Sequence, residues 1–255
     1  MAHLKRTLEG IIGVKNSINV YYASPDNLQE TQDWSILYKE PKSLNSYLLD
    51  NLNKTRNKDV NNRAYMSCTA FQRMTGNTYV IENPMTSSYT FNETIESTSK
   101  NSLPILIKRE PQLNNQILFE YDYPIIFFAE ESLEIQYTPP YFLNAPHMQY
   151  GAVTPGQYNI GKWFRPIQTE INLWEDIDEF KIKENEPLAF VNFMTDKKIN
   201  FKLFHMSSEL SKIMNVCATS STWEVNIPLK KRYKRFHESK MLQKTLYLIK
   251  QNLVK

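Results

Sequence analysis

Glycine is unusually scarce in this sequence. It contains 6 glycines in 255 residues, whereas ordinary usage of about 7% would give roughly 18. Loops that hold nucleotide phosphates place several glycines within a few residues, because their backbone must approach the phosphates closely. We therefore expect no glycine-rich phosphate loop.

Cysteine and histidine are also few. The two cysteines, Cys68 and Cys217, form no C-x-x-C pair, which argues against a disulfide framework or a cysteine zinc site. We expect both to be reduced, buried thiols in a cytosolic setting. The four histidines form no H-x-H or H-E-x-x-H pair. An iron enzyme on a β-sandwich needs two histidines and a carboxylate, and His147 with His205 is the pair available for that alternative.

Long apolar runs are missing. No stretch approaches 18 consecutive apolar residues, and the basic start MAHLKRTLEG is not followed by an apolar run of the length found in signal peptides. We therefore expect neither a membrane span nor a secretory signal. What the chain does have is 41% hydrophobic and 13% aromatic residues, a composition typical of a globular protein rather than a disordered one.

A run of short apolar segments predicts a β body from about residue 65 to residue 205. β-Branched and aromatic segments alternate there with turn residues at a spacing of about 8–12 residues. These segments are residues 78–82, 88–92, 103–108, 116–121, 124–128, 132–137, 167–174, 179–183, 188–194 and 198–205. Segment 188–194 is apolar on both faces, as in a strand covered on both sides. The expected fold class is mainly β, with an antiparallel β-clip or jelly-roll-like body.

Flanking segments complete the predicted organisation. We expect strands at residues 11–22 and 35–38 and helices between Pro41 and Asn62, at 206–215 with Ser207 or Ser208 as N-cap, and at 229–253. The expected divisions are an N-terminal extension of strands and one helix over residues 1–62, the β body over residues 63–228, and a basic C-terminal docking helix over residues 229–255.

Residues 138–166, TPPYFLNAPHMQYGAVTPGQYNIGKWFRP, are the best candidate site. They hold five of the 13 prolines and three of the 6 glycines, together with six aromatic residues. Rigid aromatic loops often carry binding sites. The candidate binding residues are Tyr141, His147, Tyr158, Trp163 and Arg165, with Arg165 able to clamp an anion or a carboxylate. The alternative is an ordered loop that covers one end of a barrel, with Arg165 paired to a nearby acid.

Positive charge is concentrated at the C-terminal end. The chain has a net charge of +3, but residues 229–255 alone carry +8, which leaves −5 for residues 1–228. The expected basic surface consists of Lys230, Lys231, Arg232, Lys234 and Arg235. This segment fits contact with nucleic acid, an anionic membrane, or a docking helix whose apolar stripe covers the sheet or a partner. We favour the docking helix as the simplest of the three. The charge is concentrated before Met241 and the apolar stripe after it, which argues against a helix lying in a membrane interface.

Two stretches resemble an uncharacterised protein family of tailed marine bacteriophages. They are CTAFQRMTGNTYVIENP at Cys68–Pro84, and PGQYNIGKWFRPIQTEINLW with ENEPLAFVNF within Pro155–Phe193. The resemblance covers about the last three quarters of the chain and implies no particular activity.

A more remote likeness is to the β-clip fold of dUTPases and dCTP deaminases. That family has a Gly-aliphatic-Asp-x-Asp-Tyr stretch and a later Gly-Asp-Arg-Ile-Ala-Gln segment, and residues 151–158 and 185–190 stand near these positions. Thr154, Pro187 and Phe190 would replace the catalytic aspartate, the arginine and the glutamine. The resemblance therefore implies the scaffold without its nucleotide chemistry.

The expected function is that of a non-enzymatic phage accessory or virion-associated protein in the host cytoplasm or the virion. It would act through contacts with a partner protein or with itself as a homo-oligomer, with nucleic acid as a further partner of the basic helix and without a membrane. We expect no catalytic residue, no cofactor and no metal. The alternative is an enzyme, either a nucleotide-processing β-clip relative or a cupin-type metal enzyme that uses His147 and His205.

Overall fold

The computed structural model describes residues 17–23, 39–54, 68–84, 86–91, 95–97, 106–109, 118–141, 143, 145–174, 177, 179–223 and 226–254. The strand predicted at residues 35–38 lies outside these ranges, as do the first six residues of the segment predicted at 11–22.

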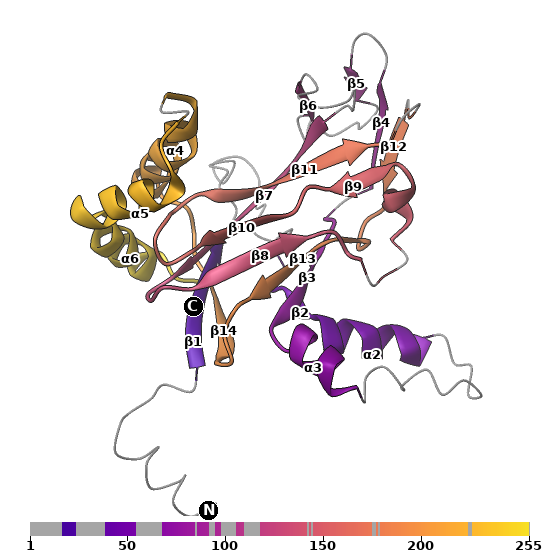
Figure 1. Cartoon of the computed structure of the whole chain (residues 1–255), viewed down its shortest axis with the longest axis horizontal. Helices are drawn as coiled ribbons and strands as arrows, with labels where there is room; N and C mark the ends of the chain where they lie inside the picture. Colours follow the sequence, from indigo (N-terminus) through magenta and orange to yellow (C-terminus); the bar gives the residue numbers. More distant parts are fainter. Residues whose placement is uncertain are drawn as a thin grey trace, which may run out of the picture.

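Three sheets form the β part of the described chain (Figure 1). The first sheet has the order β14 (Lys198–Leu203), β1 (Ser17–Ala23), β7 (Leu118–Ala129), β11 (Pro166–Leu173) and β9 (Gly151–Val153), with β6 (Leu106–Arg109) also paired to β7. The second sheet has the order β10 (Gly156–Asn159), β8 (Glu134–Thr138), β13 (Pro187–Phe193), β3 (Thr78–Glu82) and β2 (Lys42–Ser43). The third sheet has the order β12 (Glu179–Ile182), β4 (Ser87–Phe91) and β5 (Ile95–Ser97).

Antiparallel pairing dominates, and the described strand pairs include one parallel pair, β1 with β14. β1 also pairs with β7, so this N-terminal strand lies inside the first sheet rather than beside it. The expectation of a mainly β protein is confirmed.

Residues on opposite faces of the first sheet enter two different cores. On β1 and β7, Val20 and Phe127 face the second sheet, in a core that includes Ile135 and Val191. Their neighbours Tyr21, Ala23, Ile126 and Phe128 face the C-terminal helices instead. Because side chains alternate along a strand, a strand that is apolar at every position needs cover on both sides.

Within the described ranges, six helices pack around the sheets. They are α2 (Leu44–Lys54), α3 (Thr69–Thr75), the 3-10 helix η4 (Pro146–Gln149), α4 (Ser208–Trp223), α5 (Leu229–Glu238) and α6 (Met241–Gln251). Leu44 and Leu48 of α2 are buried against Val80 and Phe190 on the outer face of the second sheet. Strand β13 is therefore covered on both faces, as the apolar run 188–194 predicts. The layers run from α2 and α3 through the second and first sheets to α4–α6.

Several element predictions are wrong in instructive ways. The strands predicted at residues 116–121 and 124–128 form one long strand, β7. Its pairing with β11 shifts register between Tyr121 and Ile125, in the stretch that contains Pro124, and such irregularities accommodate a residue without an N–H. Helix α3 falls where only strands were expected. Helix α4 extends well past residue 215, and the backbone N–H of Leu210 donates to Ser207 Oγ at 3.3 Å, which confirms Ser207 as the N-cap.

The single helix predicted over residues 229–253 is also wrong. Lys240 has a φ of 59°, in the left-handed region, and it separates α5 from α6. A left-handed residue after a helix is usually glycine, so the lysine gave no signal of a break. Because of this turn, Phe236 of α5 and Ile249 of α6 both enter the core above the first sheet.

Candidate functional site

The C-terminal helices form a layer on the outer face of the first sheet, on the side of the molecule away from α2 and α3 (Figure 1). Helix α6 packs against both α4 and α5. Polar contacts help to fix the layer: the Asn159 N–H donates to the Tyr233 hydroxyl oxygen of α5 at 2.8 Å, and Lys250 of α6 pairs with Glu130 at 3.0 Å. The layer is therefore part of the folded body rather than an appended tail.

A groove of about 800 Å³ opens between α4 and α5, next to the first turn of α6. Its floor is apolar, since Trp163, Ile213, Cys217 and Phe236 line it and each is less than 10% exposed. Val216 lines the same groove and is 67% exposed. Because such an exposed apolar side chain lies within an apolar groove, it marks a surface that no described part of this chain covers.

Helical periodicity brings the groove-lining residues together. On α4 they are Glu209, Lys212, Ile213, Val216, Cys217 and Thr219, and on α5 they are Arg232, Arg235, Phe236 and the following Ser239. Residues spaced three and four apart share one face of a helix. Each helix therefore turns one continuous stripe toward the groove.

Cations surround the apolar floor. Lys212 of α4, Arg235 of α5 and Lys244 of α6 are all exposed, so each of the three helices contributes a positive charge. Within the described residues, Lys212 and Lys244 make no ion pair. The one acid of the lining is Glu209. The groove is therefore apolar at its base and electropositive at its edges.

The Cys217 thiol in the floor is not set up as a nucleophile. Burial raises its pKa to about 11, against smaller opposing effects from the Phe164 backbone and Arg165. A thiol with that pKa is protonated at neutral pH, and the thiolate is the reactive form. Cys217 thus contributes to packing, as the sequence predicted, whereas Cys68 is exposed just before α3 and the prediction of a buried thiol there is wrong.

The structure does not bring the five predicted binding residues together. Trp163 lies in the groove floor, 5.9 Å from Phe236 between ring centroids. Tyr141 lies beyond the other sheet, where its half-exposed ring meets Phe190 edge-on at 5.2 Å. His147 is fully buried beside Phe180. The aromatic segment therefore spreads over several parts of the fold.

Tyr158 and Arg165 lie near each other and near Tyr233 of α5. Burial raises the Tyr158 pKa well above its ordinary value, with a smaller lowering by Arg165. The Tyr158 hydroxyl is buried and has no hydrogen-bond partner among the described residues. Arg165 is half-buried, and its Nε donates to the Pro166 carbonyl at 3.3 Å. Among the described residues, Arg165 makes no ion pair with an acid, so the pairing expected for an ordered loop is not seen.

The predicted basic surface is present except at one position. Lys230, Lys231, Lys234 and Arg235 are exposed on α5. Arg232 is only 9% exposed and its Nε donates to the Ile227 carbonyl at 3.2 Å. The prediction is wrong for Arg232, because its position on α5 faces the body of the protein together with Phe236.

The two histidines of the enzyme alternative lie on different elements. His147 is on η4, and His205 follows β14, where its backbone N–H donates to the Asn252 carbonyl at 2.8 Å. Across the described ranges no three His, Cys, Asp or Glu side chains are grouped as metal ligands.

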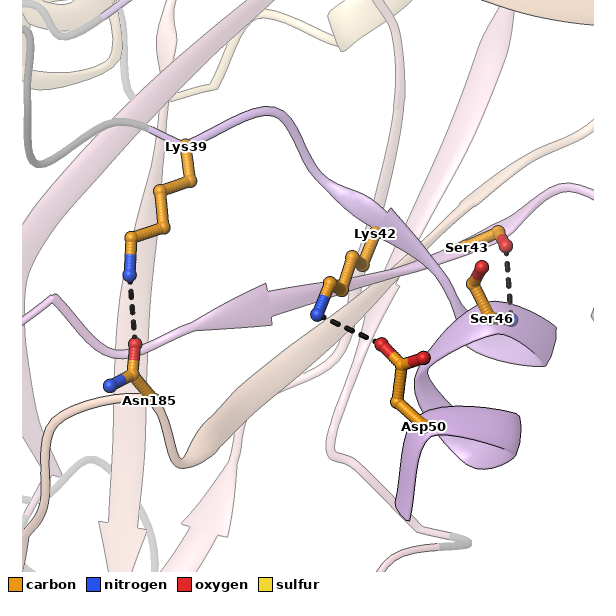
Figure 2. Close-up of polar contacts among 6 residues, drawn as sticks. All are labelled: Lys39, Lys42, Ser43, Ser46, Asp50 and Asn185. Carbon is orange, nitrogen blue, oxygen red and sulfur yellow. Dashed lines mark hydrogen bonds and ion pairs between the residues drawn. The ribbon is translucent and has the colours of Figure 1, made fainter. Parts of the chain in front are cut away.

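A second, smaller pocket of about 150 Å³ lies where β2 and β3 meet the turn before β13. Figure 2 shows polar contacts at this place: Lys39 Nζ donates to Asn185 Oδ1 at 2.9 Å, with both residues in the pocket lining, and Lys42 of the lining pairs with Asp50 of α2 at 3.1 Å. The Ser46 N–H donates to Ser43 Oγ at 3.2 Å, which caps α2. The Lys42–Asp50 ion pair and the Ser43 cap hold α2 at the sheet edge.

No family model, curated protein or solved structure matches this chain. Among the helices that the structure describes, none has the length and apolar character needed to cross a bilayer.

The residues of α4 that line the groove were missed from the sequence. The stripe Glu209, Lys212, Ile213, Val216 has the i, i+3, i+4, i+7 spacing of a helix face. The signal was present, but ending the predicted helix at residue 215 left out its exposed apolar member.

Proposed function

We propose that this chain is a non-enzymatic binding protein that acts through protein–protein contacts, and that its docking site is the groove between α4 and α5. The partner presents a segment that combines apolar side chains with carboxylates. The single observation that carries the proposal is Val216, which is 67% exposed in a groove with an apolar floor that Lys212, Arg235 and Lys244 also line. Electrostatic complementarity of this kind selects partners and speeds their association.

The wider setting is part of the same proposal. The resemblance of Cys68–Pro84 and Pro155–Phe193 to a family of tailed marine bacteriophages supports an accessory or virion-associated role in the host cytoplasm or the virion. Two facing, mostly antiparallel sheets support a jelly-roll-like or β-clip-like scaffold for that role.

A peptide-display selection tests the proposal. Immobilised protein is offered a library of random 15-residue peptides, and the recovered peptides are measured against Val216→Asp and Lys231→Glu. We expect peptides rich in Asp, Glu and large apolar residues that lose binding to Val216→Asp and keep it with Lys231→Glu, since Lys231 is exposed on α5 but does not line the groove. Recovery of peptides that bind the Val216→Asp protein equally well would refute the groove as the docking site.

A further inference from the structure

The groove between α4 and α5 has the form of an incomplete helix bundle. Helix α6 packs against α4 and against α5, while the groove separates the facing stripes of α4 and α5. Ridges on one helix fill grooves on its neighbour when the axes are about 8–10 Å apart. A helix placed between these two stripes would complete a four-helix arrangement with α4, α5 and α6.

We infer that the segment bound in the groove is an acidic amphipathic α-helix of about three turns from a partner protein. This inference rests on the proposed docking function and adds the conformation and charge pattern of the occupant. On α4 the lining runs from Glu209 to Thr219, which at 1.5 Å per residue is about 15 Å of helix axis. An occupant of about 10–12 residues matches that length.

Apolar side chains of the occupant have a defined place to go. Trp163, Ile213 and Phe236 form a continuous floor, and the half-buried Met241 lies beside them. A helix with leucines at i, i+3, i+4 and i+7 presents a stripe that fits such a floor. Covering Val216 would also remove a largely exposed apolar side chain from water.

The charges favour carboxylates on both sides of that apolar stripe. Lys212 and Arg235 belong to the two helices that form the walls, and Lys244 to the third helix. Carboxylates that flank the leucines would therefore meet a cation on either wall, whereas lysines there would be repelled. The Glu209 carboxylate would repel carboxylates of the occupant, so its removal should strengthen binding.

A designed peptide provides the test. The probe is a fluorescein-labelled, capped 12-residue peptide with leucine at positions 2, 5, 6 and 9, glutamate beside them and alanine elsewhere. Binding is measured by fluorescence anisotropy, and helix formation by far-ultraviolet circular dichroism. One control peptide carries proline at position 7, which breaks the helix, and a second replaces every glutamate by lysine. A 20-base-pair DNA duplex is titrated in parallel.

The expected pattern is specific to a helix in this groove. The probe binds with a Kd on the order of 10 µM and gains helix, and both control peptides bind at least tenfold more weakly. Lys212→Glu and Lys244→Glu each weaken binding about fivefold, Val216→Asp weakens it at least tenfold, and Glu209→Gln strengthens it. Lys231→Glu is the matched control on α5 and leaves binding unchanged. Val216, Lys212 and Lys244 are exposed, and thermal unfolding verifies that the variants fold.

Other outcomes separate the two proposals. If the proline peptide binds as well as the probe and both lose binding to Val216→Asp, the groove takes an extended segment; the helix is then wrong and the docking function stands. If the probe fails to bind, or binds Val216→Asp unchanged, the helix inference is overturned. If only the DNA duplex binds, and Lys231→Glu weakens it while Val216→Asp does not, the basic face of α5 contacts nucleic acid and both proposals fail for this groove. Light scattering of the protein alone excludes a second copy as the occupant if it shows a monomer.

Discussion

His147 should make the protein lose stability as the pH falls through the weakly acidic range. The side chain projects from η4 and is fully buried beside Phe180 of β12, and burial lowers its pKa from 6.5 to about 4, against a smaller raising effect of the Leu188 backbone. Neither ring nitrogen forms a hydrogen bond of normal geometry with the described residues. The folded protein therefore holds a neutral imidazole in a site that does not accept a proton easily.

The direction of the effect follows from proton binding. Above about pH 6.5 the imidazole is neutral in both the folded and the unfolded chain, so pH has no effect through His147. Between about pH 6.5 and pH 4 the unfolded chain binds a proton that the folded chain does not, and stability falls as pH falls. A shift from 6.5 to about 4 corresponds to about 3 kcal/mol at 1.36 kcal/mol per pKa unit.

Urea unfolding of the wild type and of His147→Leu, measured from pH 4 to pH 8, tests this expectation. Carboxylates contribute to acid sensitivity in both proteins, so the difference between the two curves isolates His147. We expect the wild type to lose about 3 kcal/mol more than the variant between pH 7 and pH 4. Parallel curves would show that the imidazole is solvated in the folded protein, contrary to its burial in the structure.

Further predictions concern packing. A Cβ on Gly161 would lie 1.9 Å from the Glu131 carbonyl oxygen, whereas a Cβ on Gly156 would meet nothing within 4 Å. In urea denaturation, Gly161→Ala should therefore lower the free energy of unfolding by about 2–4 kcal/mol. Gly156→Ala should leave the free energy of unfolding nearly unchanged. Tyr158→Phe should raise the thermal midpoint, because it removes a buried hydroxyl that has no partner among the described residues. We expect the variant to be more stable by about 1 kcal/mol. A lower midpoint would instead indicate that a bound water satisfies the hydroxyl. Deletion of residues 229–255 should yield aggregated protein by light scattering, because it uncovers the outer face of the first sheet, and a soluble monomer would contradict the layered core.

Strand identity could be read from the sequence wherever the pattern was local. The β-branched and aromatic segment 78–82 became β3 with the same bounds. The doubly apolar run 188–194 became β13, which is covered on both faces. Leu44 and Leu48 on the predicted helix became the buried face of α2. In each case a short stretch of sequence shows which residues are buried, so the interpretation does not depend on contacts with distant parts of the chain.

The candidate site could not be read in the same way, because its walls come from distant parts of the chain. The aromatic segment 138–166 pointed to Trp163, which does lie in the groove floor, but His147 and Tyr141 belong to separate regions of the fold. These residues are close in sequence, which suggested one site. In the fold they are far apart, because the strands of this segment belong to two different sheets.

Scarcity of glycine was determined by the sequence alone, and it argued against a glycine-rich phosphate loop. Only the tertiary structure shows why glycine is required at positions 151 and 161: at each, a Cβ would clash with the backbone of a neighbouring segment. The basic charge of residues 229–255 was likewise fixed by sequence. Where that charge lies depended on the left-handed turn at Lys240, which folds α6 back beside α5 and places cations around an apolar groove. Composition sets which charges and apolar groups a chain has, but only packing between distant segments sets which of them face the same space.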